Sequence, residues 1–445
     1  MVGARAVGSR ARCLVLLAAI VGLLVAIHFV IVLLPLRTSR CASGDGSTAG
    51  APSLSRKAIP QCLRAWAERD RAQVQAQLVD RGFTLRLPPP PQQKEASCQK
   101  RAAVYIASYR SLLRYLHHMP HFCEVYFNFY SLLIWQDMVL EERCIHSFIV
   151  DDSISSYWQK SPYDADAEWM GDLVKIVDRQ WSTKSVISDS CPWLQAPVAP
   201  AANANANASG RATANVVRGA LHGWFLHPVD AVMLQAAVLG EDPCDPTNRA
   251  ALTDPSVAVL VLSRKSNRRL MHAEILAEFL RAKPSVKAVS VVAFGGGPGS
   301  LQHQARLLHG ASVLIATHGA GNTNMAFMRP CSVIIELFPA LFFIPGYFGS
   351  LAQRAGLLHF PMQAAANASH FLTPLRRECK QAFLRAGQSQ GDASAECFQD
   401  AVCRRCARSV DLIEIDFERL GLLLDKALEA RSRCLADSLY YSNLL

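Results

Sequence analysis

The hydrophobic residues between positions 257 and 337 occur in short continuous runs rich in valine, isoleucine and leucine. Such runs predict strands that are buried on both faces, and the apolar residues between them follow the spacing of amphipathic helices. The predicted strands are residues 257–262, 286–294, 312–317 and 332–337. Strands that alternate with helices form a parallel sheet with crossover helices on its two faces. The pattern therefore predicts an α/β fold for this part of the chain.

Chemically active residues follow these strands at their carboxyl ends. Arg264 follows the first strand, glycines 295–299 follow the second, and His318-Gly-Ala-Gly321 follows the third, while Glu336 lies near the end of the fourth. Ligands of open parallel sheets bind at this edge. A cation, glycine backbone that allows close approach and the N-terminus of the next helix suit the phosphates of a nucleoside diphosphate, and a carboxylate suits ribose hydroxyls. The sequence predicts a nucleotide site here.

Each of these residues also has a purely structural interpretation. The glycines at 295–299 fit neither the dinucleotide-binding fingerprint nor the P-loop, which favours an ordinary loop. His318 alone is typical of a turn, and Arg268 and Arg269 are compatible with a solvated helix face. Glu336 is harder to explain in this way, because a carboxylate in an apolar strand needs partners when it is buried.

The longest apolar run of the chain is residues 13–36, interrupted only by His28. A membrane-spanning helix needs about 20 apolar residues, whereas the core of a cleaved signal peptide is shorter. Arginines precede the run, which indicates a cytoplasmic N-terminus. We expect a cytoplasmic tail at 1–12, a single transmembrane signal anchor at 13–36 and a stem at 37–97 that includes a short helix; a cleaved signal peptide is the alternative.

Features after the anchor fit the lumen of the secretory pathway. Asn207 and Asn367 each begin an Asn-Ala-Ser sequon, which is glycosylated only there. Thirteen of the 14 cysteines follow the apolar run, which suits an oxidising compartment. Cys403 and Cys406 form a CxxC pair without a second pair or a histidine at ligand spacing, which favours a structural disulfide over zinc. The chain ends without a KDEL-type signal, so the Golgi membrane is as plausible a location as the endoplasmic reticulum.

Composition and charge narrow the function classes. Apolar residues make up 51% of the chain and charged residues 18%, which excludes a disordered polar chain. Half of the net charge of +10 comes from arginines that flank the apolar run, and no basic block follows, so no nucleic-acid partner is expected. Asp164-Ala-Asp166 spells the DxD motif of metal-dependent transferases, but no hydrophobic strand precedes it. We therefore predict a surface turn there and no metal site.

Several blocks at the predicted sheet edge resemble a known family. The signature of glycosyltransferase family 61 is similar to Thr317-His-Gly-Ala-Gly-Asn-Thr-Asn324, Phe327-Met-Arg-Pro330 and Val333-Ile-Ile-Glu-Leu337, and its upstream arginine motif to Ser263-Arg264 with Arg268-Arg269-Leu270. Pro120-His-Phe-Cys-Glu124 resembles the His-Phe-Cys-Asp block of the branch that transfers O-linked N-acetylglucosamine to EGF domains. The resemblance spans about residues 98–345.

The resemblance implies a GT-B-like fold, in which two Rossmann-type lobes face each other across a cleft. Residues 98–250 would form the acceptor-side lobe and residues 251–345 the nucleotide-sugar-binding lobe, followed at 346–445 by a closing segment and a Cys-rich tail. It also implies an inverting reaction with a UDP-sugar donor and without a divalent metal or another cofactor.

The resemblance assigns site residues by their match to the motifs. The donor would be bound by Arg264, Arg268, Arg269, His318, Gly319, Ala320, Gly321, Asn322 and Glu336. Among these, Arg264 and His318 to Gly321 would contact the diphosphate and Glu336 the nucleoside. Glu124 stands where the family has an aspartate and is the candidate base for the acceptor hydroxyl, with His121 beside it; a structural role in the lobe is the alternative. Asn322 replaces a commoner leucine, a departure that bears on donor choice.

Together these features predict a membrane-anchored, lumenal glycosyltransferase. In the favoured version it moves N-acetylglucosamine from UDP to Ser or Thr of a secretory protein or to a glycan. The close alternative is a UDP-xylose or UDP-arabinose transferase that acts on a polysaccharide or glycan. A non-catalytic module that binds sugar nucleotides or glycans is a further alternative. A pyridine-nucleotide oxidoreductase is disfavoured, because the chain lacks the glycine fingerprint.

Overall fold

The computed structural model divides the chain into two compact units, residues 1–53 and 54–445, and every described residue belongs to the second. The described residues are 59–80, 103–107, 119–139, 145–150, 164–181, 215–219, 223–245, 257–265, 267–294, 300–364, 377–387, 392–410 and 412–437. The expected tail and anchor, both sequons (Asn207 and Asn367) and glycines 295–299 lie outside these ranges. None of the helices within these ranges is long and apolar enough to cross a membrane.

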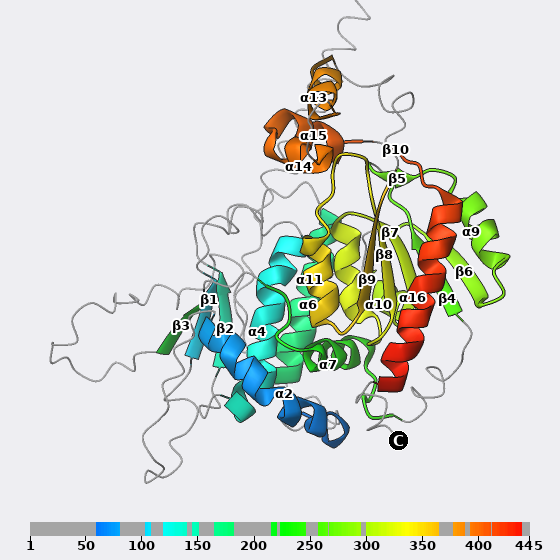
Figure 1. The fold of residues 1–445 in the computed structure, drawn as a ribbon. Coiled ribbons are helices and arrows are strands. Elements are labelled where there is room, and N and C mark those ends of the chain that lie inside the picture. The colour runs from blue at the N-terminus through cyan, green and yellow to red at the C-terminus, as the bar shows by residue number, and fades with distance from the viewer. Residues whose placement is uncertain are drawn as a thin grey trace, which may run out of the picture. The chain divides into compact units, whose positions relative to one another are not determined.

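A five-stranded, entirely parallel sheet forms the centre of the C-terminal half (Figure 1). Its strands are β4 (Val257–Leu262), β6 (Val286–Val292), β7 (Val313–Thr317), β8 (Val333–Phe338) and β9 (Leu358–Gln363). The first four are the predicted strands, which confirms the α/β prediction. The fifth was not predicted, because Pro361 and His359 interrupt its apolar pattern; β9 tolerates the proline because it lies at the edge of the sheet.

The order of the strands places a ligand site. The sheet runs β6-β4-β7-β8-β9, so the chain starts in the interior at β4, moves outward to β6 and then continues from β7 in the opposite direction. The carboxyl ends of β4 and β7 therefore lie at the point where the order reverses. In doubly wound sheets the crossover helices diverge at this point and leave a crevice for ligands.

Successive residues of the strands alternate between two hydrophobic clusters, so both faces of the sheet are buried. The odd-numbered residues of β4, β7 and β8 pack against α9 (Ala273–Arg281) and α16 (Phe417–Asp437). The even-numbered residues pack against helices that include α10 (Ser300–His309) and α11 (Gly346–Arg354). All six residues of β8 are buried, Glu336 included.

The same even-numbered face continues into the N-terminal half. Its cluster includes buried residues of α4 (Met119–Val139), α6 (Asp164–Trp181) and α7 (Pro228–Leu239). A second parallel sheet, in the order β2-β1-β3, accompanies these helices and consists of β1 (Ala103–Ala107), β2 (Ile145–Val150) and β3 (Asn215–Gly219). A continuous core therefore joins the helices of both halves, and two lobes that face each other across a cleft stay a prediction.

The helix expected within the stem is part of the folded body. α2 (Gln61–Asp80) buries Leu63, Trp66 and Val74 in the same cluster as α4 and α7, and Cys62 is linked to Cys244 by a disulfide. Residues 61–80 of the expected stem therefore form a packed helix, and the bounds of the stem at 37–97 stay a prediction. An amphipathic helix is stable in a protein when its apolar face is covered, and here α4 and α7 cover it.

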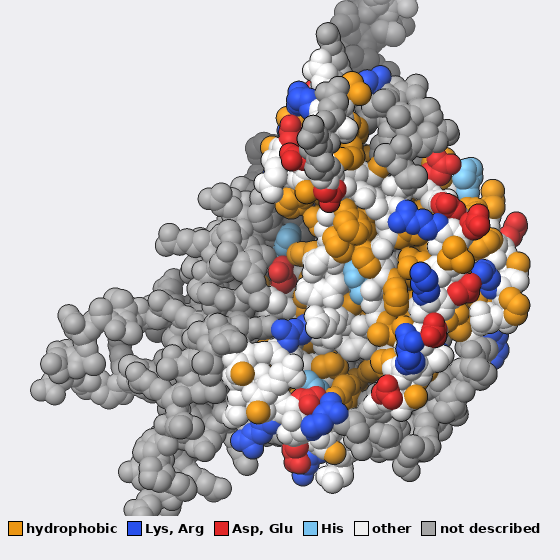
Figure 2. Space-filling model, viewed as in Figure 1, with side chains coloured by type: hydrophobic (Ala, Val, Ile, Leu, Met, Phe, Trp, Pro, Cys, Tyr) orange, Lys and Arg blue, Asp and Glu red, His pale blue; other side chains and the backbone are white. Residues whose placement is uncertain are grey.

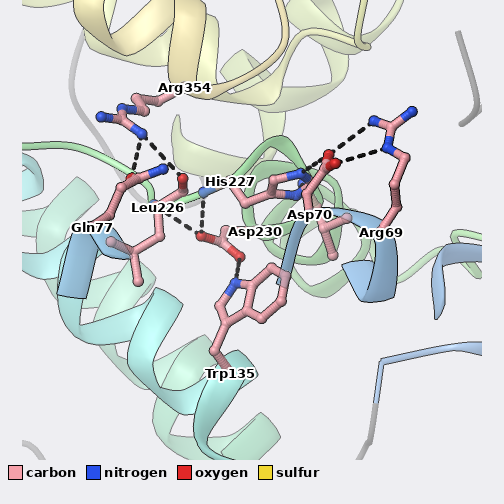
Figure 3. Close-up of polar contacts among 9 residues, drawn as sticks. Arg69, Asp70, Gln77, Trp135, Leu226, His227, Asp230 and Arg354 are labelled. Carbon is pink, nitrogen blue, oxygen red and sulfur yellow. Dashed lines mark hydrogen bonds and ion pairs between the residues drawn. The ribbon is translucent and has the colours of Figure 1, made fainter. Parts of the chain in front are cut away.

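Polar contacts reinforce this packing (Figure 3). His227 caps the N-terminus of α7, and its Nε2 lies 2.9 Å from an Asp70 carboxylate oxygen on α2. Arg354 of α11 donates hydrogen bonds to the Gln77 side chain of α2 and to the Leu226 carbonyl oxygen. The side chain of Asp230 accepts from Trp135 of α4 at 2.7 Å. These bonds fix α2, α4, α7 and α11 relative to one another.

The C-terminal residues extend the sheet domain beyond the expected boundary at 345. β9 and α16 both pack into the sheet layers, and a disulfide links Cys331 to Cys434 of α16. Between them lie three short helices, α13 (Arg377–Gly387), α14 (Ala393–Gln399) and α15 (Ala401–Arg408).

Two disulfides hold these short helices together. The bonds join Cys379 to Cys406 and Cys397 to Cys403. The cysteines of the CxxC pair thus form structural disulfides as predicted, although not with each other. Cys123 of α4 is buried and forms no disulfide.

The surface view shows basic and acidic side chains interspersed over one face of the molecule (Figure 2). Lys283, which follows the end of α9, and Asp425 of α16 form an ion pair with 3.2 Å between nitrogen and oxygen. This arrangement agrees with the small net charge of residues 41–445. The absence of a nucleic-acid partner stays a prediction.

His309 makes the fold sensitive to pH. Its Nδ1–H donates to the Phe327 carbonyl oxygen at 3.3 Å and its Nε2 accepts from Arg329 at 3.1 Å, so the ring is neutral. Burial and the charge of Arg329 lower its pKa from 6.5 to about 4, although the Glu241 carboxylate lies 3.7 Å from Nε2. The unfolded chain therefore takes up this proton at a higher pH than the folded chain does.

We expect this histidine alone to lower the free energy of unfolding by about 2 kcal/mol between pH 7 and pH 5. His309→Gln supplies one donor and one acceptor without titrating and is expected to lose that part of the pH dependence. Urea unfolding of both proteins at the two pH values measures the difference. An equal loss of stability in both would contradict the assignment of a neutral ring.

Candidate functional site

The predicted arginine and the glycine turn meet where the strand order reverses. Arg264 follows β4 and Gly319 follows β7, and the two strands are neighbours in the sheet. A Cβ atom built at Gly319 would lie 1.8 Å from Nη1 of Arg264. The guanidinium of Arg264 therefore lies directly on the glycine backbone, and its Nε donates to the Asn267 carbonyl oxygen at 2.9 Å. A cation and accessible backbone thus share the predicted edge of the sheet.

Glu336 organises the residues beside this turn. Its side chain is fully buried and accepts three hydrogen bonds. Oε1 accepts from His318 at 2.7 Å and from Asn322 at 3.1 Å, and Oε2 accepts from His359 at 2.8 Å. The predicted contact of Glu336 with a nucleoside is not what this geometry favours, because the carboxylate is already occupied. Its clearest role is to hold His318, Asn322 and His359 in place.

His318 is enclosed by aromatic rings. The ring centroids of Phe338, Phe342 and Phe348 lie 4.9, 5.5 and 5.4 Å from its own. Burial lowers the pKa of His318, and the hydrogen bond to Glu336 offsets this only in part. Burial alone would raise the pKa of Glu336, but the bonds from His318 and His359 hold it below its usual value. The pair is therefore a neutral imidazole and an ionised carboxylate.

This protonation state determines what His318 can bind. Nδ1 carries the proton that Glu336 accepts, so Nε2 carries a lone pair. A lone pair accepts a hydrogen bond from a hydroxyl group, such as one of a sugar or ribose, more readily than it pairs with a phosphate oxygen. The two predicted roles at the turn therefore divide, with charge neutralisation on the arginines and hydroxyl binding on His318.

Arg268 brings a second cation to the same place. Arg268 is 8% exposed, and its backbone takes the left-handed conformation (φ 61°), which residues other than glycine and asparagine rarely adopt. Burial, the charge of Arg264 and the charge of Arg408 lower its pKa to about 9, and the charge of Glu336 opposes this. Arg269 follows on strand β5 (Arg269–Leu270) and is exposed, so the structure does not bring it together with Arg268.

Buried polar atoms without a partner gather around this site. Among the described residues, Arg268 Nε, Thr317 Oγ1, Asn322 Oδ1 and Thr323 Oγ1 are buried and make no hydrogen bond. Burying such atoms without partners is costly, so each one needs an explanation. Their concentration in one turn and its arginine agrees with a site that binds a polar ligand.

The segment after His318 forms a 3₁₀ helix, η4 (Ala320–Phe327). Ala320 and Gly321 are half-buried at its start, while Asn322 and Asn324 are buried. Asn324 Oδ1 accepts a hydrogen bond from Trp169 of α6 at 3.2 Å. The turn that would approach a ligand is therefore held in place by hydrogen bonds to Glu336 and to Trp169 of α6.

The candidate base lies on α4 and has a partner that the sequence did not reveal. Nδ1 of His121 lies 3.5 Å from the Glu124 carboxylate, and both contact the Tyr347 hydroxyl, at 3.2 and 3.3 Å. Burial and the charge of Glu124 raise the pKa of Tyr347, so the phenol donates to Glu124. Tyr347 adjoins Phe348, which packs on His318. The candidate base and the predicted donor-binding residues around His318 thus belong to one region of the fold.

Two residues that sequence reasoning missed complete the site. His359 was hidden in an edge strand with a proline, and Tyr347 belongs to no recognisable motif. Asp164 and Asp166 open helix α6, so the predicted surface turn is wrong at that position. Within the described ranges, no group of three or more His, Cys, Asp or Glu side chains could hold a metal ion.

Gly319→Ala is expected to displace the Arg264 guanidinium and to weaken UDP binding about tenfold, which corresponds to about 1.4 kcal/mol. The fold should remain, because the φ of 165° is extended and the displaced group is the end of a long side chain. Gly171→Ala on α6 is the control, since a Cβ there meets nothing within 4 Å. Calorimetric titration with UDP and a thermal melt measure both effects. Unchanged UDP affinity in Gly319→Ala would contradict the predicted contact.

The comparison with known families agrees with this geometry. Residues 167–335, from α6 into β8, match the model of the glycosyltransferase 61 family. The match covers the arginine motif and the turn after β7 but not residues 120–128, so it does not test the resemblance to the O-linked N-acetylglucosamine transferase branch. A search of curated proteins finds no match. The matched region supports a glycosyltransferase as the class of protein.

Proposed function

We propose that this chain is an inverting glycosyltransferase that takes a sugar from a UDP donor. The family match over residues 167–335 supports sugar transfer as the reaction class. The observation that carries the donor assignment is the Arg264 guanidinium against the Gly319 backbone, at the point where the strand order reverses. That point is where doubly wound sheets bind nucleotides.

Different residues bind different parts of the donor. Arg264 and Arg268 neutralise the diphosphate, and the backbone from Gly319 to Gly321 approaches it closely at the start of η4. His318 accepts a hydrogen bond from a hydroxyl group of the ribose or the transferred sugar. Glu336 holds His318 and supplies a negative charge that acts on Arg268.

The reaction needs a base for the acceptor. Glu124 removes the proton of the acceptor hydroxyl, whose oxygen attacks the anomeric carbon from the side opposite to UDP. The bond from that carbon to the diphosphate oxygen breaks, UDP leaves with the electron pair, and the configuration is inverted. The contacts of Glu124 with His121 and Tyr347 support this role, because they hold the carboxylate beside the aromatic residues around His318.

The favoured donor is UDP-N-acetylglucosamine and the favoured acceptor is Ser or Thr of a secretory protein or a glycan. UDP-xylose or UDP-arabinose with a polysaccharide acceptor is the alternative. The setting is the lumen of the Golgi or endoplasmic reticulum, reached through the single anchor at 13–36. Disulfides between described cysteines support an oxidising compartment, as do the sequons at Asn207 and Asn367.

The test uses the purified full chain in detergent and a panel of UDP-sugars, with UDP release as the measurement, with and without EDTA. We expect release from one sugar, unchanged by EDTA and reduced in Arg264→Ala. Arg419→Ala, which removes an exposed arginine on α16, is the control and should behave as the wild type does. UDP binding without release from any sugar would favour the non-catalytic binding module. Failure to bind UDP would refute the donor assignment.

A further inference from the structure

The three helices α13, α14 and α15, held by two disulfides, reach the candidate donor site. The backbone N–H of Arg268 donates to the Val410 carbonyl oxygen at 2.5 Å. Two residues further on, β10 (Leu412–Ile413) pairs in parallel with β5. Figure 1 shows the three helices at the same end of the sheet as β5 and β10. We call residues 377–410 the disulfide cap.

The disulfide cap also contacts Phe342, one of the three phenylalanines that surround His318. Phe342 is buried in one cluster with Cys379, Cys397 and Cys406 of the cap. The ring of the same phenylalanine lies 5.5 Å from that of His318. The cap is therefore attached to the site at two places, through the backbone at Arg268 and through the side chain of Phe342.

Arg408 is the last residue of α15 and lies two residues before Val410. The backbone bond from Arg268 to Val410 therefore holds Arg408 near the arginine pair. Two effects on neighbouring groups agree with this position, because the charge of Arg408 lowers the pKa of both Arg268 and Tyr347. Its side chain is exposed, and no ion pair of Arg408 exists among the described residues. Arg408 thus acts on both Arg268, one of the donor cations, and Tyr347, the partner of the candidate base.

Three cations gather around this point. The charges of Arg264 and Arg408 both lower the pKa of Arg268, and the charge of Glu336 opposes them. The Glu336 carboxylate is already bonded to His318 and His359. Guanidinium groups that lie close together repel one another, and an anion that binds between them removes this repulsion. The Nε atom of Arg268, which is buried without a partner in the described structure, indicates the same missing ligand.

We propose that Arg408 of the disulfide cap is a third cationic ligand for the diphosphate of the donor, so that the cap forms one wall of the nucleotide-sugar site. The proposal rests on the proposed function, because it adds a residue to the same UDP site. It places the residue at the end of the diphosphate nearer to Tyr347 and Glu124, where the bond to the sugar breaks. Arg408 then stabilises the charge that develops on the leaving UDP.

A simpler role for Arg408 would be favourable interaction with the dipole at the C-terminus of α15. Arg405 lies in the same last turn, is also exposed, and shares that interaction. Arg405→Gln is therefore a matched control that removes an identical charge from the same turn. Arg408→Lys is a second variant, which keeps the charge and loses the planar fork that binds phosphate through two bonds.

The experiment measures binding of UDP, UMP and uridine to the full chain and its variants by calorimetric titration at two salt concentrations. Arg408→Gln is expected to weaken UDP binding about tenfold and uridine binding less than twofold. The UDP affinity of Arg408→Lys should lie between those of Arg408→Gln and the wild type. The UDP affinity of Arg405→Gln should match that of the wild type. The salt dependence of UDP binding should decrease in Arg408→Gln, because one fewer charge pairs with the ligand.

The outcomes separate the two proposals. If the wild type binds UDP and Arg408→Gln binds it with the same affinity, the role of Arg408 is overturned and the proposed function still stands. An equal loss in Arg405→Gln and Arg408→Gln would also overturn it, since both variants then act through the helix. If the wild type does not bind UDP, the proposed function fails and this inference fails with it. A thermal melt of each variant checks that the cap remains folded.

Discussion

Glu336→Ala is expected to abolish UDP binding and to lower the free energy of unfolding by about 3–5 kcal/mol, the usual cost of removing one partner of a buried ion pair. Glu336 is fully buried and accepts from His318, Asn322 and His359. Alanine leaves all three donors without an acceptor. It also removes the negative charge that faces Arg268, so the arginines around the donor site repel one another more strongly.

Glu336→Gln removes the negative charge but keeps the shape of the side chain. The glutamine oxygen can still accept from His318 and Asn322, while His359 can accept from the amide nitrogen if its proton moves to Nδ1. We expect this variant to fold with a smaller loss of stability and to bind UDP about 10–100-fold more weakly, or about 1.4–2.8 kcal/mol. Urea unfolding and UDP titration measure the two effects. Wild-type affinity in Glu336→Ala would show that this carboxylate does not organise the site.

The stabilising effect of Glu336 should also depend on pH with a defined sign. The hydrogen bonds from His318 and His359 hold its folded pKa below the ordinary value of 4.5, so the contribution is present above that value and is lost as the pH falls through the folded pKa. The lowered pKa of His318 acts in the same direction over a higher range. Below pH 6.5 the unfolded chain gains a proton that the buried imidazole resists.

Asp230→Ala is the second change with a large expected effect, and it acts on stability. The carboxylate is fully buried and accepts from four donors: the Ser131 hydroxyl, the Trp135 indole, and the backbone N–H groups of Leu226 and His227. Three of these contacts are visible in Figure 3. Each buried donor left without an acceptor costs about 1–3 kcal/mol, so the expected loss is at least about 4 kcal/mol.

Asp230→Asn is expected to be nearly as harmful, because its amide would present N–H groups to donors. Asp172→Ala, which removes an exposed ion pair with Lys175 on α6, is the control and should change stability by less than about 0.5 kcal/mol. Urea unfolding measures all three variants. A loss below about 1 kcal/mol in Asp230→Ala would mean that α7 is held to α4 by apolar packing alone.

The sequence predicted the parts of this protein that depend on local pattern. Continuous apolar runs define the three inner strands β4, β7 and β8, because residues that are buried on both faces must nearly all be apolar, and a similar run marks the edge strand β6. The positions of Arg264 and His318 after two of those strands then place both at one edge of a parallel sheet. The motifs from Arg264 to Glu336 indicated a resemblance to glycosyltransferase family 61, and the match of residues 167–335 to the model of that family supports it.

Predictions that depended on distant partners were less successful. α2 was recognised as a helix but was placed in a stem, because its amphipathic pattern does not reveal whether α4 and α7 cover it. Glu336 was recognised as a carboxylate that needs partners, but its direct partner His359 lies on a strand that the sequence concealed. Pro361 breaks the strand pattern, and only the edge position of β9 makes it acceptable.

The sequence by itself therefore determined the fold class, the edge of the sheet that carries the chemistry, and the candidate cations and imidazole at that edge. Only the tertiary structure decided the cysteine pairings, the contact of Tyr347 with Glu124, and the position of Arg408 near Arg268. The physical reason is that hydrophobic periodicity records which face of an element is buried but not what buries it. Contacts between residues far apart in the chain depend on how the whole core packs.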